Sequence, residues 1–163
     1  TLMASPLQLK SGSVTAHTEM VMDKTIDPKS SSLKGDLTID GSDITTMRGK
    51  FYIEASLFKS DNAKRDDHMH QEMEVGKFKL ATYTISSVVK NGQDYTINGK
   101  LNFHGTEKEL SAKAKLKDSG TTISLDASSS FLMSDFGIKP PCMVFMCVRD
   151  KLDLTVNATM TKE

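Results

Sequence analysis

The chain has 163 residues, a length that suits one domain with one core, and we expect a single domain over residues 1–163. Basic and acidic residues both number 21, so the formal net charge is zero. This balance argues against a nucleic-acid binder, which needs surplus positive charge to neutralise phosphates. No window approaches the roughly 18 apolar residues of a transmembrane helix. The first residues also lack the basic region and apolar run of a signal peptide.

The first third of the chain shows the alternation of apolar and polar residues that is typical of strands with one buried face. A first strand is predicted within residues 6–26, and a turn-rich stretch with Asp27-Pro28 follows. A short strand is predicted over residues 33–40, and a turn at residues 40–43. The next strand, over residues 44–59, is expected to bend near Arg48 and Gly49.

Residues 60–74 interrupt this alternation. They are polar and rich in helix-forming residues, so we expect a short helix near residues 63–74. Asp61 or Asn62 would cap its first turn by accepting bonds from the free backbone N–H groups.

The alternation then returns and continues to the end of the chain. A strand is predicted over residues 77–87, with a bulge near Ala81 because the parity of the apolar residues shifts there. Asn91-Gly92 and His104-Gly105 predict tight turns. Further strands are expected over residues 95–103, 110–117, 123–133 and 148–160. The sequence therefore predicts an antiparallel all-β protein of about eight strands, as a sandwich or a closed barrel.

Many of the inward-facing residues are small. An eight-stranded barrel is just wide enough to be filled by side chains or to hold one slender ligand, so small inward residues favour a cavity. The small inward residues are Ala16, Ala55, Ala112, Ala114, Ala127, Ser129 and Ala158.

Three segments, in this order, resemble signatures of the YceI-like family of polyisoprenoid-binding proteins. The first, Ser60 to Met69, is similar to a family stretch with Asn, Arg-Asp and His at matching spacing. The second is the strand pair from Tyr95 to Gly105. The third, Ser134-Asp135-Phe136-Gly137-Ile138, resembles the family's Asp-Phe-Gly-Ile signature.

The resemblance implies an antiparallel, eight-stranded, lipocalin-like barrel with a short helix beside its mouth. It implies that the protein binds a long, slender lipid and performs no chemistry on it. We therefore expect no cofactor other than a bound lipid, such as a polyisoprenoid or a fatty acid derivative. A periplasmic or secreted location, a homodimer and transient membrane contact are further expectations. The expected function of the protein is to carry or sequester the lipid.

We expect the lipid tail to contact inward-facing apolar residues. This predicted ligand set consists of Phe51, Ile53, Phe78, Tyr83, Ile85, Tyr95, Ile97, Phe103, Leu125, Phe131 and Phe136.

The charged residues of the interrupting stretch have the types needed for acid–base catalysis, but a structural role is preferred. Arg65 and Asp66 are expected to bond to each other and to the loop backbone, since no nucleophile accompanies them. His68 and His70 lie two residues apart without other ligands in metal-site spacing. We therefore predict neither a catalytic residue nor a metal site.

Cys142 and Cys147 are the two cysteines of the chain. In an extended strand they would lie roughly 16 Å apart, so a disulfide requires the chain to loop back between them. Pro140-Pro141 makes such a loop plausible, and in an oxidising compartment we expect the bond. Two alternatives stay open: a thiol or Cu(I)-binding role for the two cysteines, and a protein-interaction module whose barrel is filled.

Overall fold

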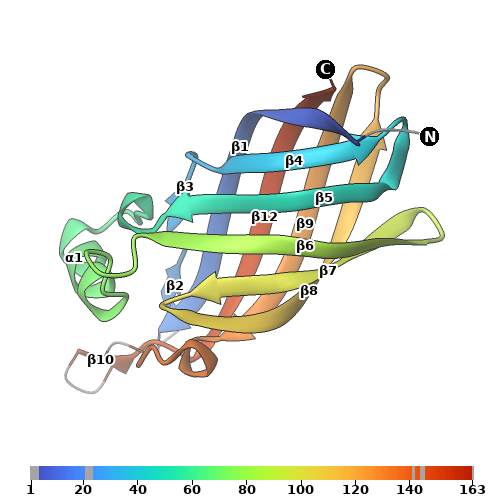
Figure 1. Ribbon diagram of the computed structural model, residues 1–163. Helices are drawn as coiled ribbons and strands as arrows, with labels where there is room; N and C mark the ends of the chain where they lie inside the picture. Colours follow the sequence, from blue (N-terminus) through green and yellow to red (C-terminus); the bar gives the residue numbers. More distant parts are fainter. Residues whose placement is uncertain (1–3, 21–23, 141, 144–145, 163) are drawn as a thin grey trace.

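The computed structural model describes residues 4–20, 24–140, 142–143 and 146–162, and its long strands form a closed antiparallel barrel (Figure 1). Eight long strands build the wall: β1 (Ala4–Met20), β4 (Lys34–Asp40), β5 (Asp43–Glu54), β6 (Leu80–Asn91), β7 (Asp94–Phe103), β8 (Thr106–Asp118), β9 (Thr122–Leu132) and β12 (Lys151–Lys162). Shorter elements are β2 (Lys24–Ile26), β3 (Lys29–Ser30), η1 (Ala55–Leu57), α1 (Ala63–Glu72), η2 (Met133–Phe136), β10 (Cys142–Met143) and β11 (Met146–Cys147). The predicted all-β barrel with a short helix is confirmed.

The barrel closes because β1 and β12 pair along most of their length. The order around the wall is β12, β9, β8, β7, β6, β5, β4 and β1, and the β1–β12 pairing joins its two ends. Hairpins β4–β5, β6–β7 and β8–β9, the start of β1 and the end of β12 lie away from α1 (Figure 1). Closure removes the unpaired edges that an open sheet would expose.

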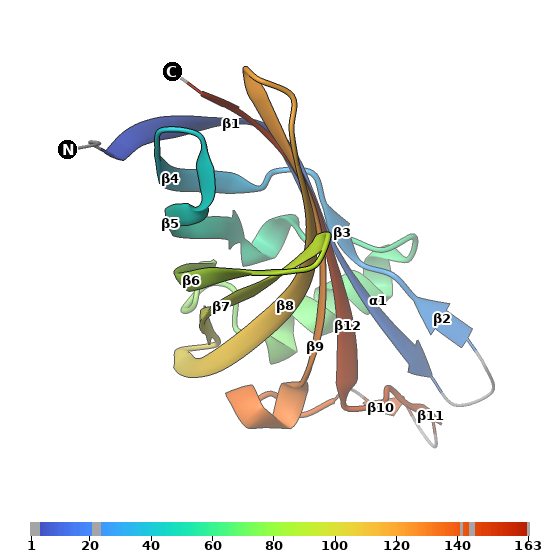
Figure 2. The same ribbon diagram turned by 90° about the vertical axis from the view of Figure 1, so that its right-hand side faces the viewer.

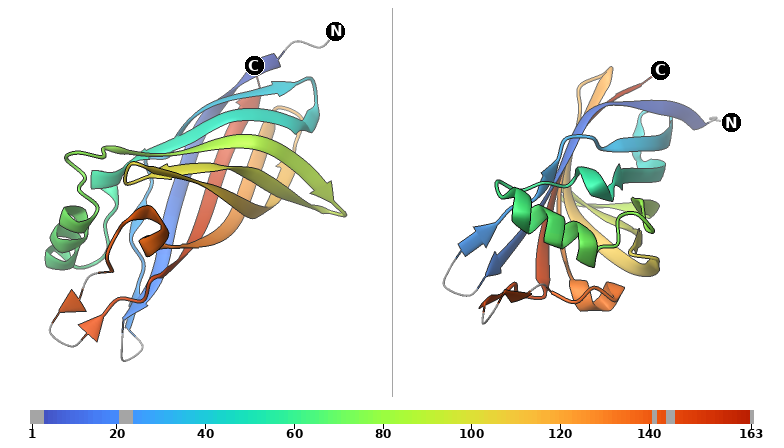
Figure 3. Two further views of the ribbon diagram at one scale, coloured as in Figure 1. Left: turned by 60° about the horizontal axis from the view of Figure 1, so that its bottom comes forward. Right: turned by 90° about the vertical axis from the view of Figure 1, so that its left-hand side faces the viewer.

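Helix α1 lies across the other end of the barrel, where Figure 3 shows it in front of the strands. Asn62 caps it, because its side-chain oxygen accepts the backbone N–H of Arg65 at 3.0 Å. Of the two predicted caps, Asn62 is therefore the one used. No helix among the described residues is long and apolar enough to cross a membrane.

Several predicted strand limits were wrong for local reasons. Strand β5 ends at Glu54 and continues as η1, which leaves Leu57 exposed. The predicted bend does occur at Gly49, whose φ is +119° and whose hypothetical Cβ would lie 2.0 Å from the Asp36 carbonyl oxygen. Strand β6 begins at Leu80 rather than at residue 77, and its register shift lies between Ile85 and Ser87 rather than near Ala81.

The half of the barrel farthest from α1 is filled by side chains. Met47, Ile123 and Met160 are 0% exposed, and they come from strand segments beside the hairpins and the chain end. The other buried side chains of this packed half are Leu7, Leu37, Ile39, Ile44, Ile85 and Val88. Such close packing leaves no room for a ligand at this end.

Strands β8 and β9 pair along only part of their length. Their pairing runs from Asp118↔Ile123 to Lys113↔Ser128 and stops there, although β8 extends to Thr106 and β9 to Leu132. Figure 2 shows the two strands separating as they approach η2. The wall is therefore split beside η2.

Candidate functional site

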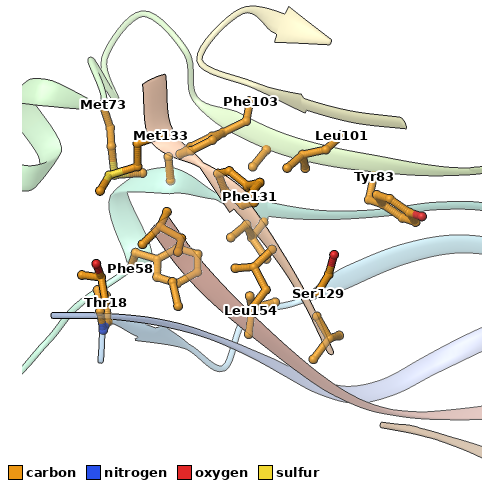
Figure 4. A pocket seen from close by; sticks show the side chains of 18 of the residues that line it. Thr18, Phe58, Met73, Tyr83, Leu101, Phe103, Ser129, Phe131, Met133 and Leu154 are labelled. Atoms are coloured by element: carbon orange, nitrogen blue, oxygen red, sulfur yellow. The ribbon is translucent and has the colours of Figure 1, made fainter. Parts of the chain in front are cut away.

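The half of the barrel nearest α1 encloses an apolar cavity with a volume of about 230 Å³. Figure 4 shows its two ends, with Met73 and Thr18 at one end and Tyr83 and Ser129 at the other. Side chains from all the long strands except β4, and from α1, line it. A concave, almost wholly apolar cavity of this kind is typical of a site for a hydrophobic small molecule.

Seven residues of the predicted ligand set line the cavity, and four do not. The seven are Phe51, Ile53, Tyr83, Ile97, Phe103, Leu125 and Phe131. Ile85 lies in the packed half, and Tyr95 packs against the same core near the β6–β7 hairpin. Phe78 precedes β6 and covers the β7–β8 turn, with its ring centroid 4.8 Å from that of His104. Phe136 is buried in η2, outside the cavity.

Tyr83 marks the inner end of the cavity and is fixed in place by its hydroxyl. The hydroxyl donates to the Leu110 carbonyl oxygen at 2.7 Å and reaches that of Ile97 at 3.3 Å. Its ring lies over Gly99, where an added Cβ would lie 2.7 Å from the Tyr83 Cζ atom. The Tyr83 ring can occupy this position only because residue 99 has no side chain. Burial raises the pKa of Tyr83 to about 12, because the phenolate would lose hydration there.

This shift gives a pH prediction. The Tyr83 phenol ionises near pH 10 in the unfolded chain but near pH 12 in the folded protein, so the unfolded state releases its proton first. Folding stability should therefore fall as the pH rises from about 10 to about 12. A spectrophotometric phenolate titration of the native protein should contain a late step that Tyr83→Phe removes. A Tyr83→Phe protein that keeps the late step would contradict this assignment.

The underside of α1 supplies apolar contacts that the predicted ligand set missed. Met69 and Met73 lie four residues apart, hence on one side of the helix, and both line the cavity. The four-residue spacing of the two methionines within the predicted helix could have indicated that both face the cavity. Leu152, Leu154 and Val156 on β12 also line the cavity. Their inward parity was readable from the sequence.

The charged residues at the α1 end have structural partners. Asp66 is only 7% exposed and accepts from the Ser60 backbone N–H at 2.9 Å and the Ser60 hydroxyl at 2.6 Å. The predicted bond of Asp66 to the loop backbone is thus present. The predicted pairing of Arg65 with Asp66 was wrong, because Arg65 lies 3.6 Å from Asp61, one helical turn away.

The two neighbouring histidines of α1 also have structural partners. His68 lies 3.9 Å from Glu72, and His70 bonds the Phe58 carbonyl oxygen at 2.7 Å. Within the described part of the chain, no group of three or more histidine, cysteine or acidic residues is arranged to hold a metal ion.

The chain was compared with models of known protein families. A family model described as the YceI-like domain matches residues 7–160. The chain belongs to the YceI-like family. A UPF0312 protein of Yersinia enterocolitica is 28% identical over 112 residues, which are 64% of this chain and 58% of that protein. One from Pseudomonas paraeruginosa is 29% identical over 113 residues, which are 64% of this chain and 59% of that protein. These matches span less than two thirds of either relative.

Solved structures share the fold of this YceI-like chain. BcnA of Burkholderia cenocepacia superposes with a TM-score of 0.79 at 14% identity, covering 91% of this chain and 95% of that one. A structure described as a polyisoprenoid binding domain from Saccharophagus degradans has a TM-score of 0.74 at 11% identity, covering 98% and 99%. At these identities the likeness shows the fold alone.

At the end of the YceI-like barrel next to α1, His104 connects three segments through its ring nitrogens and its own backbone. Its Nδ1 lies 2.9 Å from the Phe136 carbonyl oxygen, and its Nε2 lies 2.6 Å from Glu74. Gly105 beside it has a positive φ, as the predicted turn required, and so does Gly137 after η2. One histidine therefore links the turn after α1, the β7–β8 turn and η2.

Cys142 and Cys147 form a disulfide with an S–S distance of 2.04 Å. They are directly paired across the short β10–β11 hairpin, so the chain does loop back between them. The predicted disulfide is confirmed. Residues 141 and 144–145 of this loop lie outside the described residues.

Proposed function

We propose that this protein binds a long-chain amphiphilic lipid, of isoprenoid or fatty-acyl type, with the tail in the barrel cavity. The observation that carries the proposal is the 230 Å³ apolar cavity in the α1 half of a barrel whose other half is packed. Each CH₂ moved from water into such a cavity contributes about 0.8 kcal/mol. Apolar burial alone then gives useful affinity, and no chemical step on the ligand is involved.

The comparisons support the same class of ligand. The Saccharophagus degradans structure of the same fold is described as a polyisoprenoid binding domain. We propose a related role for this chain: to carry or sequester such a lipid through an aqueous compartment, collecting it by transient membrane contact, as a monomer or a homodimer. The Cys142–Cys147 disulfide supports a periplasmic or secreted location, since disulfides persist in oxidising compartments.

Native mass spectrometry of the purified protein, followed by organic extraction, tests the proposal. We expect a discrete excess mass that extracts as a prenyl or acyl lipid. If the protein instead has its bare mass and takes up no member of a panel of prenyl and acyl lipids, the proposal fails.

A cavity-filling substitution gives a matched prediction. Ala127 lies on the inner face of β9 and lines the cavity, so the ring in Ala127→Phe would occupy much of the ligand's space. We expect lipid uptake to fall at least tenfold by the same mass measurement, while the protein stays folded. Ser124→Phe adds the same ring to the exposed face of β9 and should bind as wild type. Equal uptake by both variants would show that the tail lies elsewhere.

The structure gives less support to the two alternatives. A filled barrel is at odds with the cavity. A thiol or copper role requires free thiolates, whereas both cysteines are bonded to each other.

A further inference from the structure

The split between β8 and β9 opens onto a groove on the outside of the barrel. The groove lies between the separated strands and η2, and Leu110, Phe131 and Phe136 form its apolar floor. Leu110 and Phe131 also line the internal cavity. At this place the side chains of Leu110 and Phe131 separate the groove from the cavity, and β8 and β9 are not paired there.

The backbone of the split segment is stabilised by side chains in place of the missing strand pairing. Ser129 donates its hydroxyl to the Ser111 carbonyl oxygen at 2.6 Å, and the Tyr83 hydroxyl donates to that of Leu110 at 2.7 Å. Two backbone carbonyls of β8 beside the split, those of Leu110 and Ser111, thus have partners without strand pairing.

Two lysines and two acids stand at the rim of the groove: Lys108, Lys151, Glu109 and Asp135. Lys108 has the inward parity of Leu110 and is paired with Leu101, which lines the cavity. It forms no ion pair with any described residue, whereas Lys151 lies 3.7 Å from Asp153. Glu109 has the outward parity of β8. Lys108 is therefore the lysine of this rim whose strand position follows the inward face of β8 and whose charge has no acidic partner among the described residues.

The other two ways into the cavity are less suited to a head group. The far end of the barrel is packed with buried side chains such as Met47 and Ile123. At the α1 end, the charged and histidine side chains that line the cavity have partners in the protein, as in Arg65 with Asp61 and His68 with Glu72.

Building on the proposed function, we propose that the groove between β8 and β9 holds the anionic head group of the lipid, and that the tail enters the cavity there. A carboxylate or phosphate would bind beside Lys108 through a charge-assisted hydrogen bond. The tail would pass between Leu110 and Phe131. Both side chains are only part-buried, so a rotamer change, without unfolding of any strand, would open the passage.

The first test closes the split. Continuing the β8–β9 register places Ser111 opposite Ser130, so a disulfide in Ser111→Cys/Ser130→Cys would pin the strands together. The control Lys115→Cys/Asp126→Cys places a bridge where the strands are already paired. In stopped-flow mixing with cis-parinaric acid, whose fluorescence rises in apolar surroundings, we expect the association rate to fall at least tenfold in the first bridged variant only. Uptake at the wild-type rate would overturn the entry route.

The second test concerns the head group and stands even if the new bridge does not form. Displacement of cis-parinaric acid gives the affinity for decanoate and for the neutral decanol. Lys108→Ala should weaken decanoate about tenfold and leave decanol unchanged, because only decanoate loses a charged partner. Lys113→Ala, on the exposed face of β8, should change neither. Equal losses for both ligands, or none, would overturn the head-group site.

The two proposals fail in different ways. A wild-type protein that binds neither decanoate nor cis-parinaric acid would refute the proposed function. If the wild-type protein binds both ligands, and the bridged variant and Lys108→Ala behave in the same way, only the proposed head-group site and entry route are refuted.

Discussion

Affinity for straight-chain carboxylic acids should rise steeply with chain length and then level off near about nine carbons. An apolar cavity of about 150 Å³ can hold benzene, with six carbons, so the 230 Å³ cavity should enclose about nine. Each enclosed CH₂ adds about 0.8 kcal/mol, a factor of about four in the dissociation constant. From hexanoate to nonanoate we therefore expect a gain of about 60-fold.

Titration calorimetry across a series from hexanoate to palmitate measures this limit. Beyond the plateau, added carbons must remain outside the cavity, in the groove or in solvent, where each contributes less. An affinity that keeps rising at the same slope up to palmitate would contradict the packed far half of the barrel. If the affinity of the wild-type protein does level off near about nine carbons, its cavity holds only one end of a polyisoprenoid chain.

The strands and the direction of their side chains could be read from the sequence, because the facing of a strand residue follows from its parity alone. The alternation along β9 and β12 correctly placed Leu125, Phe131 and Leu154 on the inner face. Turn glycines and the capped helix were equally local features. The disulfide was expected for an oxidising compartment, on the condition that the chain loops back between the two cysteines, and the β10–β11 hairpin meets that condition.

The position of a residue along the barrel axis could not be read in the same way. Tyr83 and Ile85 share one face of β6, yet Tyr83 lines the cavity and Ile85 lies in the packed half. Parity gives no information about depth, which depends on side chains from distant strands. Phe78 was misplaced for another reason: parity has no meaning before the strand begins at Leu80.

The split between β8 and β9 had no signal in the sequence. The alternation of Leu110 and Ala112 continues unchanged past the last paired residue, Lys113. Whether two alternating strands pair depends on the course of each through space. In this case β9 follows β12 toward η2, while β8 follows β7. Only the three-dimensional structure could therefore suggest a head-group site at this place.

Replacing Ile85 with alanine should extend the cavity into the packed half and so change the preferred chain length. Ile85 is 4% exposed and lies one inward position beyond Tyr83, at the boundary between the two halves. Truncation of a buried isoleucine to alanine typically costs about 2–5 kcal/mol of stability. It also removes about three carbons from the core, so the affinity plateau should move from about nine to about twelve carbons.

Ile123→Ala is the matched control, because Ile123 is 0% exposed but lies near the β8–β9 hairpin, at the far end of the packed half. Chemical denaturation should show a comparable loss of stability in both variants, whereas calorimetry should show a longer plateau only in Ile85→Ala. If both variants kept the wild-type plateau, the new space next to Tyr83 would not be continuous with the ligand cavity. A longer plateau in both would mean that the packed half is loosened as a whole. The parity of residues in the sequence does not give the depth of the cavity along the barrel axis. The ligand length at which the affinity levels off measures that depth.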